Sequence, residues 1–213
     1  MSVRSRLQDL EEHIAQYASS CLPITIICVS KGVSLDKMQE AYDAGIRHFG
    51  ESRLQEALLK KEKMPSDVIW HYIGPIQSNK AKAIAEHFDV IHSLASLKVA
   101  QIFSAVSQKT NRPLSCFVQV NITRNIHQQG FFVEELSHIL PLIRSLPGLQ
   151  IEGFMGLAPN TSDIEKIRNS FHSLFLLSKD FSLPFLSMGM SQDYNIALEE
   201  GSTHLRLGSY FFC

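Results

Sequence analysis

The chain has 213 residues, of which 45% are hydrophobic and 19% are charged, and its formal net charge at pH 7 is -1. This length and balance fit one globular domain and exclude a disordered, collagen-like or coiled-coil protein. The nearly neutral charge provides no overall basic field to hold nucleic acid or an anionic membrane.

The sequence carries no membrane or secretion signal that we can identify. No stretch approaches the roughly 20 apolar residues of a membrane helix, and the charged segment 1–17 lacks the apolar core of a signal peptide. The cysteines form no CxxC pair and are too sparse for a disulfide scaffold; they are Cys21, Cys28, Cys116 and Cys213. We therefore expect a cytoplasmic protein with buried, reduced thiols, and we take a monomer as the default oligomeric state.

Helices and strands are predicted to alternate along the chain. A helix at 3–19 comes first, because Leu7, Leu10 and Ile14 recur at helical spacing. The strands predicted after it cover residues 24–30, 46–49, 68–73, 89–92, 114–121, 149–155, 185–187 and 203–207. The helices predicted between them cover residues 34–45, 51–62, 79–87, 96–109, 132–144, 162–179 and 192–200.

This alternation defines the expected fold class. Strands joined by helices need right-handed crossovers and a parallel sheet. We predict an α/β fold, a single-domain (β/α)8 TIM-like barrel over residues 1–213 with an extra N-terminal helix. A doubly wound open sheet is the alternative, although no GxGxxG follows the first strand.

Chemistry in such a barrel is expected at the carboxyl ends of the strands. Lys31 directly follows the apolar run 24–30, and we expect its side chain to be partly buried. Burial disfavours the ammonium form, and a free amine can form a Schiff base with an aldehyde. A surface lysine that opens a loop is the alternative.

The ends of the last two strands suggest an anion site. Barrel enzymes often bind phosphate there. Ser191 is expected at the N-terminus of helix 192–200, while Gly208 allows close backbone approach and Ser209 adds a hydroxyl. The alternative is that Ser191 is only a helix cap and Gly208 only part of a turn.

Arg206 lies between Leu205 and Leu207, so strand alternation points it to the opposite face from the leucines. A buried guanidinium needs a partner, and a salt bridge on the outer face is the alternative to a ligand.

These residues converge on pyridoxal 5′-phosphate (PLP). Lys31 would hold the aldehyde, Ser191, Gly208 and Ser209 the phosphate, and Arg206 the ring nitrogen. Because arginine is effectively never deprotonated, it cannot give the ring nitrogen a proton, and the neutral ring is a weaker electron sink.

Five segments resemble the YggS/PROSC family of pyridoxal phosphate homeostasis proteins. They are VSK (29–31), HFGES (48–52), WHYIGPIQSNK (70–80), SMGMSQD (187–193) and GSTHLRLGS (201–209). The resemblance implies a barrel like the N-terminal domain of alanine racemase. It also implies intracellular PLP homeostasis without a dedicated reaction, and PLP-dependent apo-enzymes as candidate recipients.

The resemblance further implies roles for individual residues. Lys31 would carry PLP as a Schiff base, and Arg206 would face the pyridine nitrogen. The phosphate would be bound by Ser191, Gly208 and Ser209, with Met188 and Gly189 near it, and the ring would be walled by Ile73 and Met155. The chain departs from the family at Ser52, Asn125 and Gln128, and the last two replace charged residues, which questions the role of a second lysine.

Two other functions are compatible with the sequence. A weak PLP-dependent amino-acid racemase would need a second acid/base group on the other face of the ring, for which Tyr72 is a candidate, since the chain is too short for a second domain. A metal-dependent hydrolase would use His48, His71 and His92, which end three successive predicted strands.

Overall fold

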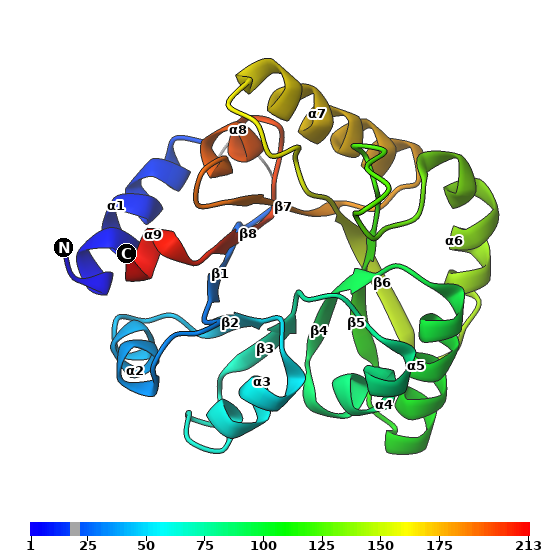
Figure 1. The fold of residues 1–213 in the computed structure, drawn as a ribbon, viewed down its shortest axis with the longest axis horizontal. Helices are drawn as coiled ribbons and strands as arrows, with labels where there is room; N and C mark the ends of the chain where they lie inside the picture. Colours follow the sequence, from blue (N-terminus) through cyan, green and yellow to red (C-terminus); the bar gives the residue numbers. More distant parts are fainter. Residues whose placement is uncertain (18–21) are drawn as a thin grey trace.

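Parallel strands close into a barrel in the computed structural model, which describes residues 1–17 and 22–213. Within these residues, eight strands pair in chain order, and β1 pairs with β8 as well as with β2, which closes the ring. The helices surround this ring (Figure 1). The predicted fold class, a (β/α)8 barrel with an additional N-terminal helix, is confirmed.

The strands of the barrel are β1 (Thr25–Val29), β2 (His48–Glu51), β3 (Ile69–Tyr72), β4 (Val90–Leu94), β5 (Leu114–Gln119), β6 (Leu149–Met155), β7 (Phe185–Met190) and β8 (His204–Leu207). The helices are α1 (Val3–Ala15), α2 (Leu35–Asp43), α3 (Leu54–Lys61), α4 (Ser78–His87), α5 (Leu97–Thr110), α6 (Leu136–Arg144), α7 (Ile164–Asp180), α8 (Tyr194–Glu199) and α9 (Ser209–Phe212), with a 3₁₀ turn, η1 (Val133–Glu135), before α6.

Local sequence signals account for where helix α2 begins and ends. The Ser34 hydroxyl caps α2 by accepting a hydrogen bond from the Lys37 amide at 3.5 Å, and Met38 and Ala41 bury one face of the helix. Gly45 follows the helix with φ +117°, a conformation that favours glycine. This helix was predictable because a capping serine, an apolar stripe and a terminal glycine follow one another in the sequence.

Side chains on each strand alternate between two environments. On β1, Cys28 is fully buried and belongs to the apolar layer between strands and helices. Ile27 and Val29 point into the barrel instead, where a Cβ on Gly50 would lie 2.9 Å from Ile27 and 3.6 Å from Val29. The inward side chains at the carboxyl ends of the strands therefore form the floor of the barrel mouth.

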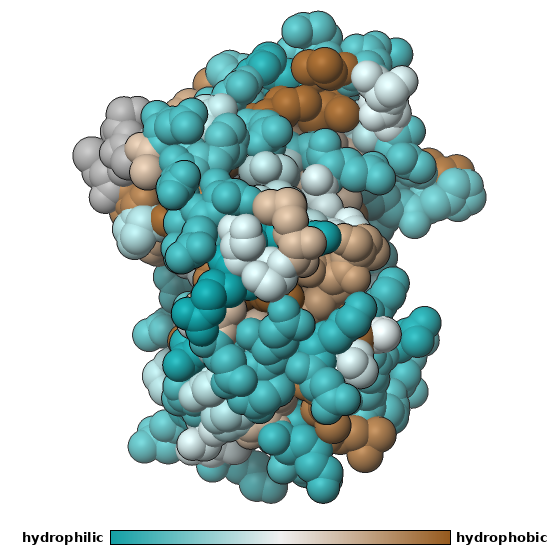
Figure 2. All heavy atoms as spheres, turned by 90° about the vertical axis from the view of Figure 1, so that its left-hand side faces the viewer, coloured by the Kyte–Doolittle hydropathy of each residue, from teal (hydrophilic) through white to brown (hydrophobic). Residues whose placement is uncertain are grey.

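The two ends of the chain lie side by side (Figure 1). Arg6 on α1 donates to the carbonyl of Tyr210 at 2.6 Å, and the Tyr210 hydroxyl donates to the carbonyl of Arg6 at 3.2 Å. Figure 2 shows the molecule from this side, and the surface there is covered mainly by hydrophilic side chains. The extra N-terminal helix thus packs on the outside of the barrel against its last helix.

Some element boundaries and environments differ from the prediction. The opening helix ends at Ala15, short of residue 19, and residues 18–21, which include Cys21, lie outside the described part of the chain. Cys28 and Cys116 are buried, but Cys213 is exposed, so the prediction of buried thiols is wrong there. No helix in the described ranges combines the length and apolar character needed to cross a bilayer.

Candidate functional site

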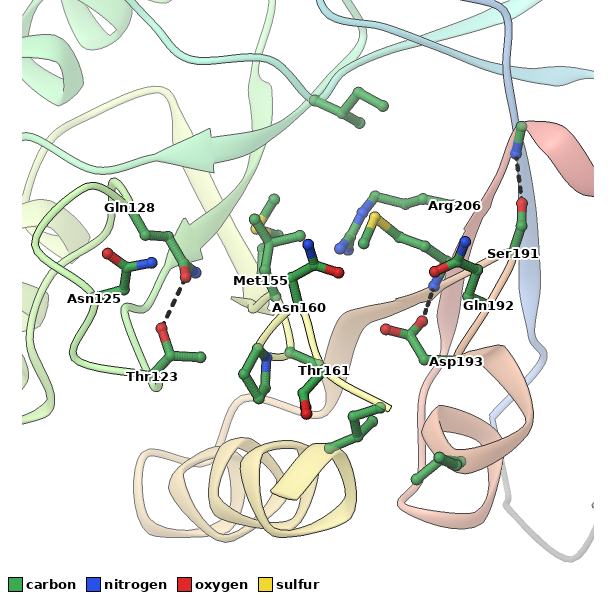
Figure 3. Close-up of a pocket in the computed structure, with 18 of the residues that line it drawn as sticks. Thr123, Asn125, Gln128, Met155, Asn160, Thr161, Ser191, Gln192, Asp193 and Arg206 are labelled. Atoms are coloured by element: carbon green, nitrogen blue, oxygen red, sulfur yellow. Dashed lines mark hydrogen bonds between the residues drawn. The ribbon is translucent and has the colours of Figure 1, made fainter. Parts of the chain in front are cut away.

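A cavity of about 1870 Å³ opens at the carboxyl ends of the strands. Val29, Ile73 and Met155 contribute apolar walls, and Arg206 contributes a charged group. Figure 3 shows Arg206 extending from β8 into the space between Met155 and the segment that follows β7. The loops after β5, β6 and β7 complete the rim.

Arg206 is the buried cation of this cavity. Its side chain is 4% exposed; Nη1 donates to the Ser187 hydroxyl at 2.7 Å and Nη2 to the carbonyl of Gly156 at 3.1 Å. Within the described residues no Asp or Glu forms an ion pair with it. The salt bridge considered as an alternative is therefore not formed, and the guanidinium keeps further N–H groups beside the cavity.

Burial acts strongly on the charge of Arg206. Desolvation lowers its pKa to about 10, with Asp193 opposing that shift, so it remains charged at neutral pH. Burial raises the pKa of Asp193, while the Met190 amide, which donates to Asp193 at 2.5 Å, and the charge of Arg206 lower it. The direct hydrogen-bond acceptors of Arg206 are thus neutral, and Asp193 acts on its charge without forming an ion pair with it.

Ser191 faces a pair of backbone amides. Its hydroxyl oxygen accepts from the Gly208 amide at 3.2 Å and from the Tyr210 amide at 3.1 Å. The expected role as the start of helix 192–200 is wrong, because Asp193 precedes α8 and Ser191 turns toward α9. Ser191, Gly208 and Ser209 all line the cavity, so the three predicted anion ligands lie together.

Lys31 follows β1 by two residues, at the edge of the site. It is exposed, which contradicts the predicted partial burial. The strand ends at Val29, one residue earlier than predicted, and Ser30 then turns outward and is fully buried. Lys31 is not among the residues that line the cavity; it lies in the turn two residues after Val29, which does line it.

A buried ionic cluster lies behind the Lys31 turn. Lys60 donates to Glu51 at 2.7 Å, to Glu56 at 2.6 Å and to the carbonyl of Ser30 at 2.6 Å. Ser30 donates its hydroxyl to Glu51 at 2.7 Å, and the Gly32 amide donates to Glu56 at 2.7 Å. The residues on both sides of Lys31 are therefore tied to the same cluster.

Met188 and Gly189 do not line the cavity. Met188 is fully buried in the apolar core. Gly189 has φ +93°, and a Cβ there would lie 2.6 Å from the Cβ of Ala197 on α8. These two residues lie behind the cavity and shape the packing of α8 on β7.

The loop after β5 carries two of the three departures from the family sequence. Asn125 and Gln128 line the cavity (Figure 3). The Asn121 side chain donates to the carbonyls of Asn125 and Gln128 at 2.9 and 3.1 Å, and the Thr123 hydroxyl donates to the Gln128 side chain at 2.8 Å. Neutral hydrogen bonds thus hold this rim.

The structure weighs against both alternative sites. Tyr72 is buried outside the cavity lining, and its hydroxyl donates to the carbonyl of Pro75 at 3.2 Å, so it is not placed as a second base. His48, His71 and His92 are adjacent, but they hydrogen-bond to one another, and no group of metal ligands is found among the described residues.

Sequence reasoning overlooked two groups at this site. Asp193 belongs to the SMGMSQD segment. An aspartate three residues after Met190 could have indicated a turn, which the Asp193 side chain closes by accepting a hydrogen bond from the Met190 amide. Ser187, the direct acceptor for Arg206, had no comparable local signal, because the contact joins the neighbouring strands β7 and β8 at a separation of 19 residues in the chain.

Comparison with known proteins agrees with this geometry. The chain matches the model of the alanine racemase N-terminal domain family over residues 5–213. A pyridoxal phosphate homeostasis protein of Vibrio alginolyticus is 37% identical over 199 residues, covering 89% of this chain and 85% of that protein. A protein of the same name from Pseudomonas aeruginosa is 38% identical over 192 residues, covering 89% and 84%.

Solved structures extend the comparison. PipY of Synechococcus elongatus PCC7942, solved with PLP bound, matches with a TM-score of 0.89 and 32% identity over all of both chains. Alanine racemase from Corynebacterium glutamicum shares the fold, with a TM-score of 0.70 at 14% identity over 93% of this chain and 58% of that one. The fold and site thus define an alanine-racemase-type barrel. Within that class, the chain belongs to the family of pyridoxal phosphate homeostasis proteins.

Proposed function

We propose that this protein binds PLP at the barrel mouth and serves intracellular PLP homeostasis. The observation that carries the proposal is the buried Arg206 guanidinium, which lines the cavity without a carboxylate partner among the described residues. A buried cation held only by neutral acceptors favours a ligand that brings an acceptor and negative charge.

The residues present fit such a ligand. Val29, Ile73 and Met155 offer apolar walls for a flat ring. Ser191 and the Gly208 amide lie at one rim of the same cavity and suit a phosphate. PipY, which was solved with PLP bound, shares the fold at 32% identity and supports the assignment.

Each residue then has a definite task. Lys31 supplies the amine that attaches the PLP aldehyde covalently, which is the chemistry that the cofactor brings to the site. Arg206 donates a hydrogen bond to the ring nitrogen and holds its own proton. Ser191, Gly208 and Ser209 bind the phosphate, and Ile73 and Met155 exclude water from the ring.

We propose a carrier without a dedicated reaction. A racemase needs a second acid/base group opposite the lysine, and Tyr72, our candidate for it, does not line the cavity. The names of the curated relatives describe homeostasis rather than a reaction. We further propose that the protein acts in the cytoplasm, as a monomer, and passes PLP to PLP-dependent apo-enzymes.

Lys31→Ala tests the attachment point. We expect wild-type protein mixed with PLP to gain a visible absorbance band, and borohydride to fix a pyridoxyl group on the peptide that contains Lys31. The Lys31→Ala protein should show neither the band nor the label. Lys37→Ala is the matched control, because Lys37 is also exposed, lies on nearby α2 and does not line the cavity.

Two outcomes would contradict the proposal. A label retained by Lys31→Ala would place the attachment elsewhere, and a wild-type protein that takes up no PLP would remove the function. The same preparation, incubated with amino acids in deuterated water, tests the carrier role: Cα exchange at about 1 per second or faster would indicate an enzyme.

A further inference from the structure

A continuous column of polar side chains crosses the barrel interior beneath Arg206. The Ser187 hydroxyl contacts Nδ1 of His92 at 2.8 Å, and Nε2 of His92 contacts Nδ1 of His71 at 2.8 Å. Nε2 of His71 contacts Nδ1 of His48 at 2.9 Å. These side chains come from β7, β4, β3 and β2, so the column spans the barrel from one wall to the other.

The direction of every hydrogen bond in the column follows from Arg206. A guanidinium can only donate, so the Ser187 oxygen accepts from it. No other acceptor for the Ser187 hydroxyl is found among the described residues, and its proton therefore goes to Nδ1 of His92. His92 must then carry its proton on Nε2 and donate to His71, which in turn donates from Nε2 to His48.

The surroundings keep these rings neutral. His71 is 1% exposed and His92 is fully buried, and burial lowers the pKa of both well below the ordinary value for histidine. Phe117 stacks on His92 with ring centres 4.5 Å apart and an interplanar angle of 9°. Because Ser187 and the histidines are neutral, they fix the position of the buried Arg206 guanidinium and leave its positive charge unpaired.

This interior departs from the usual filling of such a barrel. Branched aliphatic side chains normally fill the layers between the strands, and polar groups there lower stability unless every one is satisfied. Places where a sequence departs from the pattern that favours folding tend to be functional. The column is therefore better explained by what it does for Arg206 than by packing.

We propose that Ser187, His92 and His71 are positioning residues that fix the orientation of Arg206 and aim its remaining N–H groups at the ligand ring. None of these three residues lines the cavity. This inference rests on the proposed function, since it takes Arg206 as the partner of the PLP ring nitrogen.

Histidine tautomers in the ligand-free protein provide the first test. Nitrogen-15 NMR at pH 7 should show His92 and His71 neutral, with Nδ1 bare and Nε2 protonated, and the signals can be assigned from His92→Asn and His71→Gln proteins. A proton on Nδ1 of His92, or a doubly protonated ring, would overturn the proposed direction. This measurement needs no PLP, so it stands apart from the proposed function.

Cofactor binding by variants provides the second test. His92→Phe keeps the ring shape but removes the acceptor, and we expect the Kd for PLP to rise about tenfold and the absorbance maximum of the bound cofactor to shift. His92→Asn offers Oδ1 in place of Nδ1 and should stay within about threefold of wild type. His138→Asn, at an exposed position on α6, is the control.

A second variant protects the test against misfolding. Ser187→Ala removes one hydroxyl and should weaken PLP binding to the same extent as His92→Phe, with the unfolding transition retained. The positioning role is overturned if both variants bind PLP like wild type, or if His92→Asn binds no better than His92→Phe. If wild-type protein fails to take up PLP, the proposed function is overturned, and so is the role of Ser187, His92 and His71 in positioning Arg206 for PLP. That outcome does not depend on the result of the tautomer measurement.

Discussion

Lys60 is a buried cation with its acceptors supplied entirely by the protein. It is 6% exposed and contacts Glu51, Glu56 and the carbonyl of Ser30. Glu51 is fully buried, and its second carboxylate oxygen has no hydrogen-bond partner within the described residues. Burial is the largest influence on Glu51 and raises its pKa, while the hydrogen bonds from Lys60 and Ser30 and the charge of Lys60 act in the opposite direction.

Removing the Lys60 charge should therefore be costly. We expect Lys60→Met to lose about 3–5 kcal/mol in the free energy of unfolding at pH 7, because it leaves a buried carboxylate unpaired. Lys82→Met is the control, since the Lys82–Glu86 pair on α4 is 3.9 Å long and largely exposed; it should change stability by less than about 0.5 kcal/mol. Urea unfolding followed by circular dichroism measures both.

The same variant has a defined pH dependence. Without Lys60 the pKa of Glu51 in the folded state should rise further above its unfolded value. A carboxyl with a raised folded pKa favours folding at low pH and loses that contribution as pH rises. The deficit of Lys60→Met relative to wild type should thus shrink between pH 7 and pH 5, and an equal deficit at both values would contradict the assignment.

The sequence predicted which way a side chain points where its position within a strand decides this. Arg206 and Met155 face the cavity because inward and outward positions alternate along β8 and β6. The exposure of Lys31 was mispredicted because it depends on where β1 ends. The contacts among His48, His71 and His92 join neighbouring strands of the barrel, and no spacing in the sequence encodes them.

At the scale of elements, the spacing of apolar and polar residues was enough to predict the order of strands and helices. The short α9 was not predicted, because four residues carry no helical period. Strand β7 extends to Met190, three residues beyond the predicted end at residue 187. A glycine such as Gly189 usually indicates the end of a strand in a sequence, but here its φ of +93° is accommodated within the strand. Close packing of α8, rather than local propensity, explains this glycine.

Gly189→Ala tests the fit between β7 and α8. The added Cβ would lie 2.6 Å from Ala197 and 3.0 Å from Leu205, at φ +93°. We expect a loss of about 3 kcal/mol, combining overpacking with backbone strain. Gly32→Ala, at φ +72° with nothing within 4 Å of the new Cβ, should lose only about 1 kcal/mol in the ligand-free protein. Equal losses would show that strain alone matters at Gly189.

At the scale of the whole molecule, closure links the two ends of the chain. Strand β1 pairs with β8 over four residue pairs, from Thr25↔His204 to Cys28↔Leu207. Helix α1 contacts α9 through bonds between Arg6 and Tyr210, and the Tyr210 amide also donates to Ser191 at the cavity rim. The first helix therefore stabilises the same segment that we assign to phosphate binding.

This closure predicts that α1 and the barrel unfold together. Leu10 on α1 is fully buried, and Leu10→Ala should lower the free energy of unfolding by about 3 kcal/mol. Trp70 on β3, the single tryptophan of the chain, reports by fluorescence on a strand that lies two places from β1 around the ring. If the closed barrel is one cooperative unit, the fluorescence and circular dichroism transitions of Leu10→Ala should shift by the same amount.

The competing behaviour has a distinct signature. A helix that only rests on the barrel would open separately, as local units of low stability do. Circular dichroism of Leu10→Ala would then show an early minor transition, while the Trp70 midpoint stayed at the wild-type value. Leu142→Ala, at a half-exposed position on α6, controls for the loss of leucine side-chain volume and should move neither probe by more than about 0.5 kcal/mol. Coincident transitions would establish that α1 and the barrel unfold as one cooperative unit.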